Sequence, residues 1–102
     1  MILTEQQKQR LKNEVVECLR NQSEITKVVI FGSFLQSSSP HDLDIAIFQT
    51  SNEEYLPLAM KYRRMTRPVS ATIAVDIIPL KAGTSGGLFL DEIEQGEVIY
   101  ER

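Results

Sequence analysis

Two aspartates separated by a single residue, Asp42 and Asp44, stand at the start of an apolar run in the middle of the chain. Because alternate side chains of a β-strand project from the same face, the two carboxylates would share a face while Leu43 and Ile45 enter a core. Neighbouring carboxylates on an otherwise apolar strand are costly unless their charge is neutralised, and a divalent cation does this best. The spacing therefore predicts a metal site at Asp42 and Asp44.

A third aspartate, Asp76, lies between Val75 and Ile77 in a second apolar run. A charged side chain is rarely placed in mid-strand without a partner. If its strand pairs beside that of Asp44, the carboxylates converge and raise one another's pKa values. Magnesium takes oxygen ligands and would remove this repulsion, and two ions about 4 Å apart are usual for displacement at phosphorus. The alternative is a set of salt-bridged carboxylates at strand ends.

A glycine–serine pair, Gly32 and Ser33, closes the apolar run that precedes the aspartates. Glycine lets the backbone turn sharply and lets a ligand approach closely. If Ser33 begins a helical turn, its N–H groups and hydroxyl form a nest suited to phosphate; otherwise it is only a turn or cap residue. The pair is common alone, but after a buried strand and shortly before Asp-x-Asp it predicts a phosphate site.

Other polar and aromatic residues have structural explanations beside functional ones. His41, next to Asp42, could act as a base, although a lone loop histidine is more often solvated. Tyr55 and Tyr62 lie at helical spacing and are predicted to enter the core. Lys81 is interpreted as a surface lysine. A basic group could bind phosphate or an acidic partner, or could form a solvated helix face: Lys61, Arg63, Arg64 and Arg67.

The elements that must position these residues follow from apolar periodicity and end signals. Thr4 and Gln7 have the form of a capping box, and Ser51 and Glu54 offer another, although Pro57 suits a first helical turn. Gly96 stands where a helix C-terminal cap is expected. We predict a helix over 5–21, a strand over 26–31, a helical turn after residue 33, a strand over 43–49, a helix from about 56 to 66, a strand over 70–79, a helix from 88 to 95 and a short strand over 98–100.

This order of elements predicts an α/β or α+β fold with a small mixed sheet flanked by helices. The residues between the first two strands are too few for a crossover helix. We therefore expect at least one antiparallel pair of strands.

Composition limits the class of protein. A chain of 102 residues is expected to form one domain, residues 1–102. Its net charge of −3 and lack of a basic block do not indicate direct nucleic-acid binding. One cysteine, Cys18, excludes an internal disulfide and, with a single histidine, a Cys/His zinc cage. No membrane span or secretory signal is recognisable, so a cytoplasmic location is expected.

Three segments together resemble the nucleotidyltransferase superfamily related to DNA polymerase beta, and within it the small minimal nucleotidyltransferases. They are Phe31-Gly32-Ser33, Asp42-Leu43-Asp44-Ile45 and Val75-Asp76-Ile77. The closing segment, residues 93–101, is also similar to the typical end of these proteins. The resemblance spans nearly the whole chain and implies a polymerase-beta-like nucleotidyltransferase core.

The resemblance implies nucleotidyl transfer from a nucleoside triphosphate such as ATP, with two Mg²⁺ ions. Asp42 and Asp44 would hold the ions, and Asp76 would complete the first ion's shell and help activate the attacking hydroxyl. Gly32 and Ser33 would hold the β- and γ-phosphates. Some members are antitoxins that adenylylate a helical HEPN ribonuclease toxin on tyrosine, so the expected partner is a HEPN-type toxin protein.

Two other functions remain open from the sequence. Many family members carry a basic residue and a glycine soon after Gly-Ser, whereas this chain reads Phe34-Leu35-Gln36-Ser37. This segment favours a module of the same fold that neutralises a toxin by binding, without catalysis. A third possible function is the modification of a small molecule. A chain of this length, however, leaves little room for an acceptor-binding domain.

Overall fold

The computed structural model describes residues 2–102, apart from the side chain of residue 89. Four strands form one mixed sheet in the order β3-β2-β1-β4, in which β2 and β3 are parallel and β1 is antiparallel to both β2 and β4. The predicted mixed sheet and antiparallel pair are confirmed. In chain order the elements are α1 (Glu5–Leu19), β1 (Ile25–Phe31), α2 (Ser33–Gln36), β2 (Asp42–Gln49), α3 (Tyr55–Met65), α4 (Arg67–Ser70), β3 (Ala74–Lys81), α5 (Leu88–Glu94) and β4 (Glu97–Glu101).

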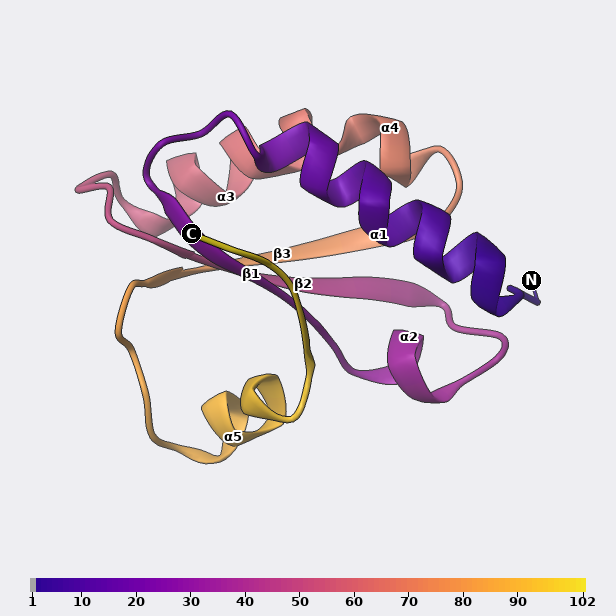
Figure 1. Cartoon of the computed structure of the whole chain (residues 1–102). Coiled ribbons are helices and arrows are strands. Elements are labelled where there is room, and N and C mark those ends of the chain that lie inside the picture. The colour runs from indigo at the N-terminus through magenta and orange to yellow at the C-terminus, as the bar shows by residue number, and fades with distance from the viewer. Residues whose placement is uncertain (1) are drawn as a thin grey trace.

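Helices cover both faces of the sheet (Figure 1). The long α1, with α3 and α4, lies on one face, whereas α5 lies on the other. Alternation along the strands sends one set of side chains into each layer. The larger core lies under α1, α3 and α4 and contains Val28, Ile30, Leu43, Ile45 and Ile47. The smaller core lies under α5 and contains Val29, Phe31, Ala46, Phe48 and Ile93.

Helix α1 follows its sequence signals closely at its start. Thr4 and Gln7 form the predicted capping box in both directions, and the helix ends at Leu19, two residues before the expected end. Two lysines on its buried side were not foreseen as core contacts. The Nζ of Lys8 donates to the carbonyl oxygen of Ser37 at 2.6 Å, and that of Lys12 lies 2.9 Å from Glu97 Oε1. These contacts tie α1 to the loop after α2 and to β4.

The third strand does not cover residues 70–79, as its β-branched composition suggested. Residues 67–70 form the short helix α4, and the strand runs instead from Ala74 to Lys81. Val69 is fully buried and anchors α4 against the core. Pro79 lies inside the strand rather than ending it, which is tolerated because β3 is at the edge of the sheet.

Helix α3 departs from prediction at its start. The capping box proposed for Ser51 and Glu54 does not form: Ser51 Oγ accepts a hydrogen bond from the backbone N–H of Glu53, and the N-cap Glu54 makes no side-chain cap bond. Pro57 is in the first turn, as predicted. Tyr62 is fully buried, but Tyr55 is 57% exposed, so its assignment to the core was wrong.

Gly96 follows α5 for a different reason from the one expected. It does not adopt the left-handed conformation of a helix cap. Instead, a Cβ at this position would overlap the backbone carbonyl oxygen of Ile30 and the side chain of Val29. Glycine therefore allows the turn between α5 and β4 to lie directly against β1, and this contact fixes α5 over the sheet.

Candidate functional site

The three aspartates lie on the face of the sheet covered by α5. In the parallel register of β2 and β3, Asp44 is the partner of Asp76, and Asp42 is the partner of Ala74. Leu43 and Val75, the residues between, point to the opposite core. Strand alternation thus separates the carboxylates from the larger core, and the pairing of β2 with β3 brings Asp76 to Asp44.

The surroundings of Asp44 disfavour the charged form of its carboxyl group. Its pKa is raised above the ordinary value, first by burial and then by repulsion from Asp76 and Asp42. A side-chain hydrogen bond with Asp76 and the charge of Glu92 on α5 raise it further. A pair of carboxyl groups in contact is stabilised when one is protonated or when a cation lies between them.

Gly32 packs directly on Asp44. Its φ of 80° is in the region that favours glycine, and a Cβ added there would lie 2.5 Å from Asp44 Oδ2. Any other residue would therefore be strained and would displace the carboxylate. The next residue, Ser33, is exposed and begins α2, so the predicted helical turn is confirmed. Phe34, fully buried, holds that turn in place.

A cavity of about 180 Å³ opens beside this glycine. Its lining comes from the Gly-Ser turn, from α2 and from α5: Gly32, Ser33, Leu35, Gln36, Glu92, Gln95 and Gly96. Glu92 and Gln95 were not predicted as site residues, because no local motif marks them and only the packing of α5 brings them here. The lining contains no lysine or arginine, so it offers phosphate hydroxyl, amide and backbone groups rather than positive charge.

The oxygen ligands that the described side chains offer fit a magnesium ion in part. Among the described side chains, no three carboxylate, histidine or cysteine groups converge closely enough to hold a metal ion by themselves. Mg²⁺, however, is commonly held by one or two carboxylates, with water and substrate phosphates as its other ligands. The Asp44–Asp76 pair supplies such oxygens, and burial together with the charges of Asp76 and Asp42 raises the pKa of Asp44. The residues present thus suit a shared protein–substrate ion rather than a preformed three-carboxylate cage.

Other residues singled out in the sequence include His41, Lys81 and Cys18. His41 is exposed in the loop before β2. The Nζ of Lys81 donates to the carbonyl oxygen of Ser51, at the other end of the strands from the aspartates. Burial, followed by the charges of Glu14 and Glu17, raises the pKa of the Cys18 thiol, which disfavours a reactive thiolate.

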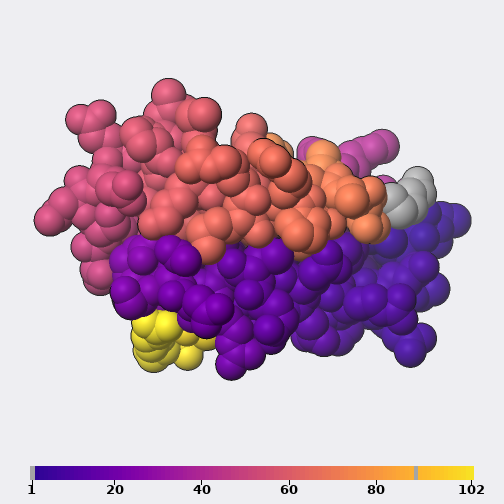
Figure 2. All heavy atoms as spheres, turned by 90° about the horizontal axis from the view of Figure 1, so that it is seen from above, coloured from indigo at the N-terminus to yellow at the C-terminus, as the bar shows by residue number. Residues whose placement is uncertain are grey.

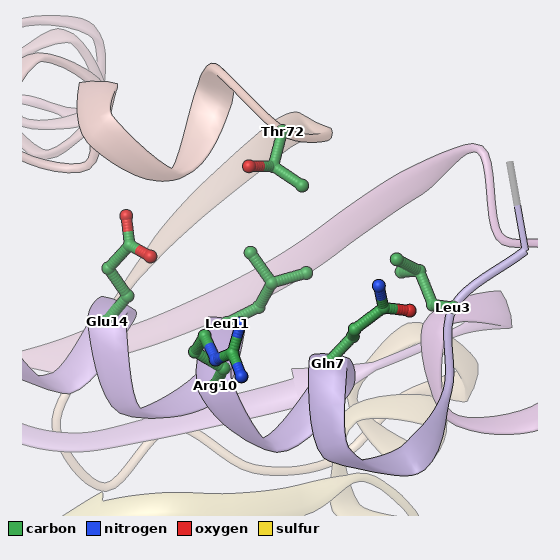
Figure 3. Close-up of a pocket in the computed structure, with 6 residues that line it drawn as sticks. All are labelled: Leu3, Gln7, Arg10, Leu11, Glu14 and Thr72. Atoms are coloured by element: carbon green, nitrogen blue, oxygen red, sulfur yellow. The ribbon is translucent and has the colours of Figure 1, made fainter.

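A second cavity of about 180 Å³ lies between α1 and the segment before β3 (Figure 3). Leu3 and Leu11 form its apolar lining, with Thr72 opposite, and Arg10 and Glu14 bring charges of opposite sign to it. It belongs to the layer of α1 and α4, and no aspartate or glycine turn borders it. It therefore lacks the groups that would handle a nucleotide.

A sequence model of one protein family, described as polymerase beta, nucleotidyltransferase, matches residues 13–102. The match includes Gly32, Ser33 and all three aspartates. The chain belongs to the polymerase beta nucleotidyltransferase family. No curated protein sequence matches this nucleotidyltransferase chain.

Solved structures share the fold of this nucleotidyltransferase domain. A crystal structure of the toxin–antitoxin pair MntA–HepT matches with a TM-score of 0.65 at 17% identity, covering 92% of this chain and 73% of that one. A tri-AMPylated Shewanella oneidensis HEPN toxin in complex with an MNT antitoxin gives 0.61 at 19%, covering 93% and 73%. A toxin–antitoxin structure with AMP-PNP gives 0.62 at 20%, covering 89% and 73%. The predicted polymerase-beta-like α+β fold is confirmed.

The helices of this nucleotidyltransferase domain were also compared with the length and apolarity that a membrane span needs. Across residues 2–102, none of them meets both requirements.

Proposed function

We propose that residues 1–102 act as a minimal nucleotidyltransferase domain that transfers AMP from ATP to a hydroxyl group of a partner protein. The partner would be a HEPN-type toxin, and the chain its antitoxin. The observation that carries the proposal is the contact of Asp44 with Asp76 beside Gly32, in a chain whose family is established. The shared fold with toxin–antitoxin structures, one of them AMPylated and one with AMP-PNP, supports it.

Each site residue has a role in this proposal. Asp42 and Asp44 would hold Mg²⁺, and Asp76 would add a third carboxylate to the shell of the first ion. Bound there, Mg²⁺ would neutralise the carboxylates and the developing charge on the phosphates. The turn at Gly32 and Ser33 would hold the β- and γ-phosphates through backbone N–H groups and the serine hydroxyl. ATP would bring most of the remaining ligands, in agreement with the incomplete protein set.

The proposed reaction is a single in-line displacement. The acceptor hydroxyl oxygen attacks the α-phosphorus and loses its proton to Asp76, while the bond from the α-phosphorus to the bridging oxygen breaks. Pyrophosphate leaves with that oxygen, and the acceptor carries AMP as a phosphodiester. Catalysis of this kind depends mainly on positioning and charge neutralisation, which are what a rigid pair of neighbouring strands can provide.

The decisive test is transfer of label from α-labelled ATP, with Mg²⁺, to a purified HEPN-type toxin protein. We expect labelling of a tyrosine or other hydroxyl in that protein, and a reduction on the order of a hundredfold for Asp44→Asn. Asp91→Asn is the matched control, because Asp91 is exposed on α5 and does not line the cavity. Its labelling should equal that of the wild type.

A binding module without catalysis is the second candidate, and the lack of basic residues around the Gly32 cavity favours it. In that case the wild type would transfer no label. Tight binding and neutralisation of the toxin would then be the same for wild type, Asp44→Asn and Asp91→Asn. This result would refute the enzymatic proposal and leave the antitoxin role intact.

A further inference from the structure

The outer side of α3 and α4 carries a stripe of exposed residues, here called the α3–α4 stripe. It consists of Leu56, Met60, Arg63, Arg64 and Arg67. Apart from the adjacent Arg63 and Arg64, successive members are three or four residues apart, so they lie on one side of the helical segment. The other side is buried through residues such as Leu58, Tyr62 and Val69. Figure 2 shows this outer face, on which α3 and α4 form a continuous band beside α1.

The apolar end of the stripe is unusually exposed. Leu56 is 66% exposed and Met60 is 52% exposed. Neither side chain contributes to the two hydrophobic cores. Large apolar side chains that are neighbours on a helix surface leave apolar area in water, and such area commonly marks a contact with another molecule.

The basic end of the stripe borders a hollow of about 430 Å³. Met60 and Ser70 line it together with the three arginines of the stripe. In the described part of the chain, no carboxylate forms an ion pair with any of these arginines. Three unpaired guanidinium groups therefore converge in a protein whose net charge is −3. They are the groups that bind carboxylates in the two-pronged manner of arginine.

Helix stability explains only part of this arrangement. Arg63 and Arg64 are in the last turn of α3, where positive charge favours the negative end of the helix dipole. That effect does not require a hollow between the guanidinium groups. It also gives no reason for the exposure of Met60, one turn earlier, or of Leu56, two turns earlier. The combination has the layout of a groove for a helix with one apolar and one charged end.

We propose that the α3–α4 stripe docks an acidic amphipathic helix of a partner protein. Apolar side chains of that helix pack on Leu56 and Met60, and its carboxylates pair with the arginines around the hollow. A nucleic acid fits less well, because two of the five residues of the stripe are large and apolar and the protein as a whole is negatively charged. The stripe and the aspartates are on opposite faces of the sheet, so docking does not cover the nucleotide site and goes beyond the proposed transfer reaction.

A synthetic peptide gives a direct test. The probe is a helical peptide of about 18 residues, with two leucines one turn apart followed on the same face by three glutamates. Titrated into the isotopically labelled full chain at low salt, it should shift the backbone NMR signals of residues 55–70. The double variant Arg63→Gln/Arg67→Gln should weaken binding about five- to tenfold. Higher salt should weaken binding of the wild type more than that of the variant.

Three controls decide the outcome. Arg10→Gln/Arg20→Gln removes the same charge from α1 and its C-terminal end and should leave binding unchanged, as should Asp44→Asn. A peptide with glutamine in place of glutamate should bind several-fold more weakly. The proposal is overturned by absence of peptide-induced shifts, by equal loss in the Arg10/Arg20 variant, or by tighter binding of a uridine oligonucleotide at the same residues. Because Asp44→Asn is expected to reduce transfer and to leave peptide binding unchanged, failure of docking and failure of the proposed reaction are distinguishable.

Discussion

At the scale of single residues, Asp44 combines three constraints that seldom coincide. Its backbone is paired in a central strand, its carboxyl group contacts that of Asp76, and it occupies space that a side chain at position 32 would fill. The resulting repulsion persists because the surrounding strands fix its position. Such stored unfavourable charge is typical of a functional site and is atypical of a residue retained only for stability.

Replacement of Asp44 should therefore stabilise the protein when no divalent cation is present. The pKa of Asp44 is raised in the folded state, so its contribution to stability is present at low pH and is lost as pH rises through that pKa. Asp44→Asn should remove this loss of stability, because asparagine has no carboxyl group to ionise. We expect the free energy of unfolding at pH 7 to increase by about 1 kcal/mol, measured by urea denaturation with a chelator.

The pH dependence separates this cause from a general effect of charge. Between pH 3.5 and 7, Asp44→Asn should lose less stability with rising pH than the wild type. Asp91→Asn, which also removes one negative charge, should follow the wild-type curve. A less stable Asp44→Asn protein with an unchanged pH profile would contradict the electrostatic interpretation.

At the scale of elements, α3 is joined to the loop before β1 by a buried hydroxyl. Tyr62 donates a hydrogen bond of 2.8 Å to Glu24 Oε2, and Lys61 lies 3.2 Å from the same oxygen. Burial would raise the pKa of Glu24, but the hydrogen bonds from Tyr62, its own backbone and Lys61 outweigh burial and lower it. Burial and Glu24 together raise the pKa of Tyr62. The contact fixes α3 along the sheet and thereby orients the α3–α4 stripe.

Tyr62→Phe should weaken this connection without leaving a cavity. Loss of the hydrogen bond should lower the free energy of unfolding by about 1–2 kcal/mol. Since the pKa of Glu24 is lowered, its contribution is present above its ordinary value of 4.5 and is lost as pH falls through the folded pKa. The variant should lose less stability in that acid range. Tyr55→Phe, on an exposed tyrosine of the same helix, should change neither quantity in thermal or urea unfolding.

At the scale of the whole molecule, the sheet separates two surfaces with different chemistry. One face presents carboxylates and the Gly-Ser turn beneath α5, and the other presents arginines and apolar side chains on α3 and α4. A partner could therefore be held at one face while the other remains open to nucleotide.

Ligand binding at the carboxylates should be visible in global stability. If Mg²⁺ and ATP bind the folded state alone, a tenfold excess over the dissociation constant contributes about 1.4 kcal/mol. For a domain of this size, the melting temperature should then rise by about 6–10 °C. Mg²⁺ alone should give a smaller rise in melting temperature. Asp44→Asn should remove most of the rise caused by Mg²⁺ alone and most of the rise caused by Mg²⁺ with ATP. An equal rise in wild type and variant would place nucleotide binding elsewhere.

Much of the fold could be read from local patterns. Thr4 and Gln7 formed the capping box that their spacing predicted, and alternation placed the aspartates opposite the main core. Prediction failed where the local structure of a segment depends on its position in the sheet or on its packing against a distant segment. Residues 70–73 were expected in the strand, but residue 70 ends α4 and residues 71–73 form the turn before β3. Pro79 is tolerated because β3 is an edge strand, and Tyr55 is exposed on α3.

The chemical groups of the candidate site could be recognised from local sequence patterns. Asp-x-Asp on a strand, a further mid-strand aspartate and a Gly-Ser turn are local features, because backbone geometry alone sets which side chains share a face. The contacts between these features appear only in the folded chain: Asp44 meets Asp76, Asp44 Oδ2 lies where a Cβ of residue 32 would be, and Glu92 approaches from α5. These contacts join residues far apart in the chain, so they depend on strand order and helix packing, which no short pattern specifies.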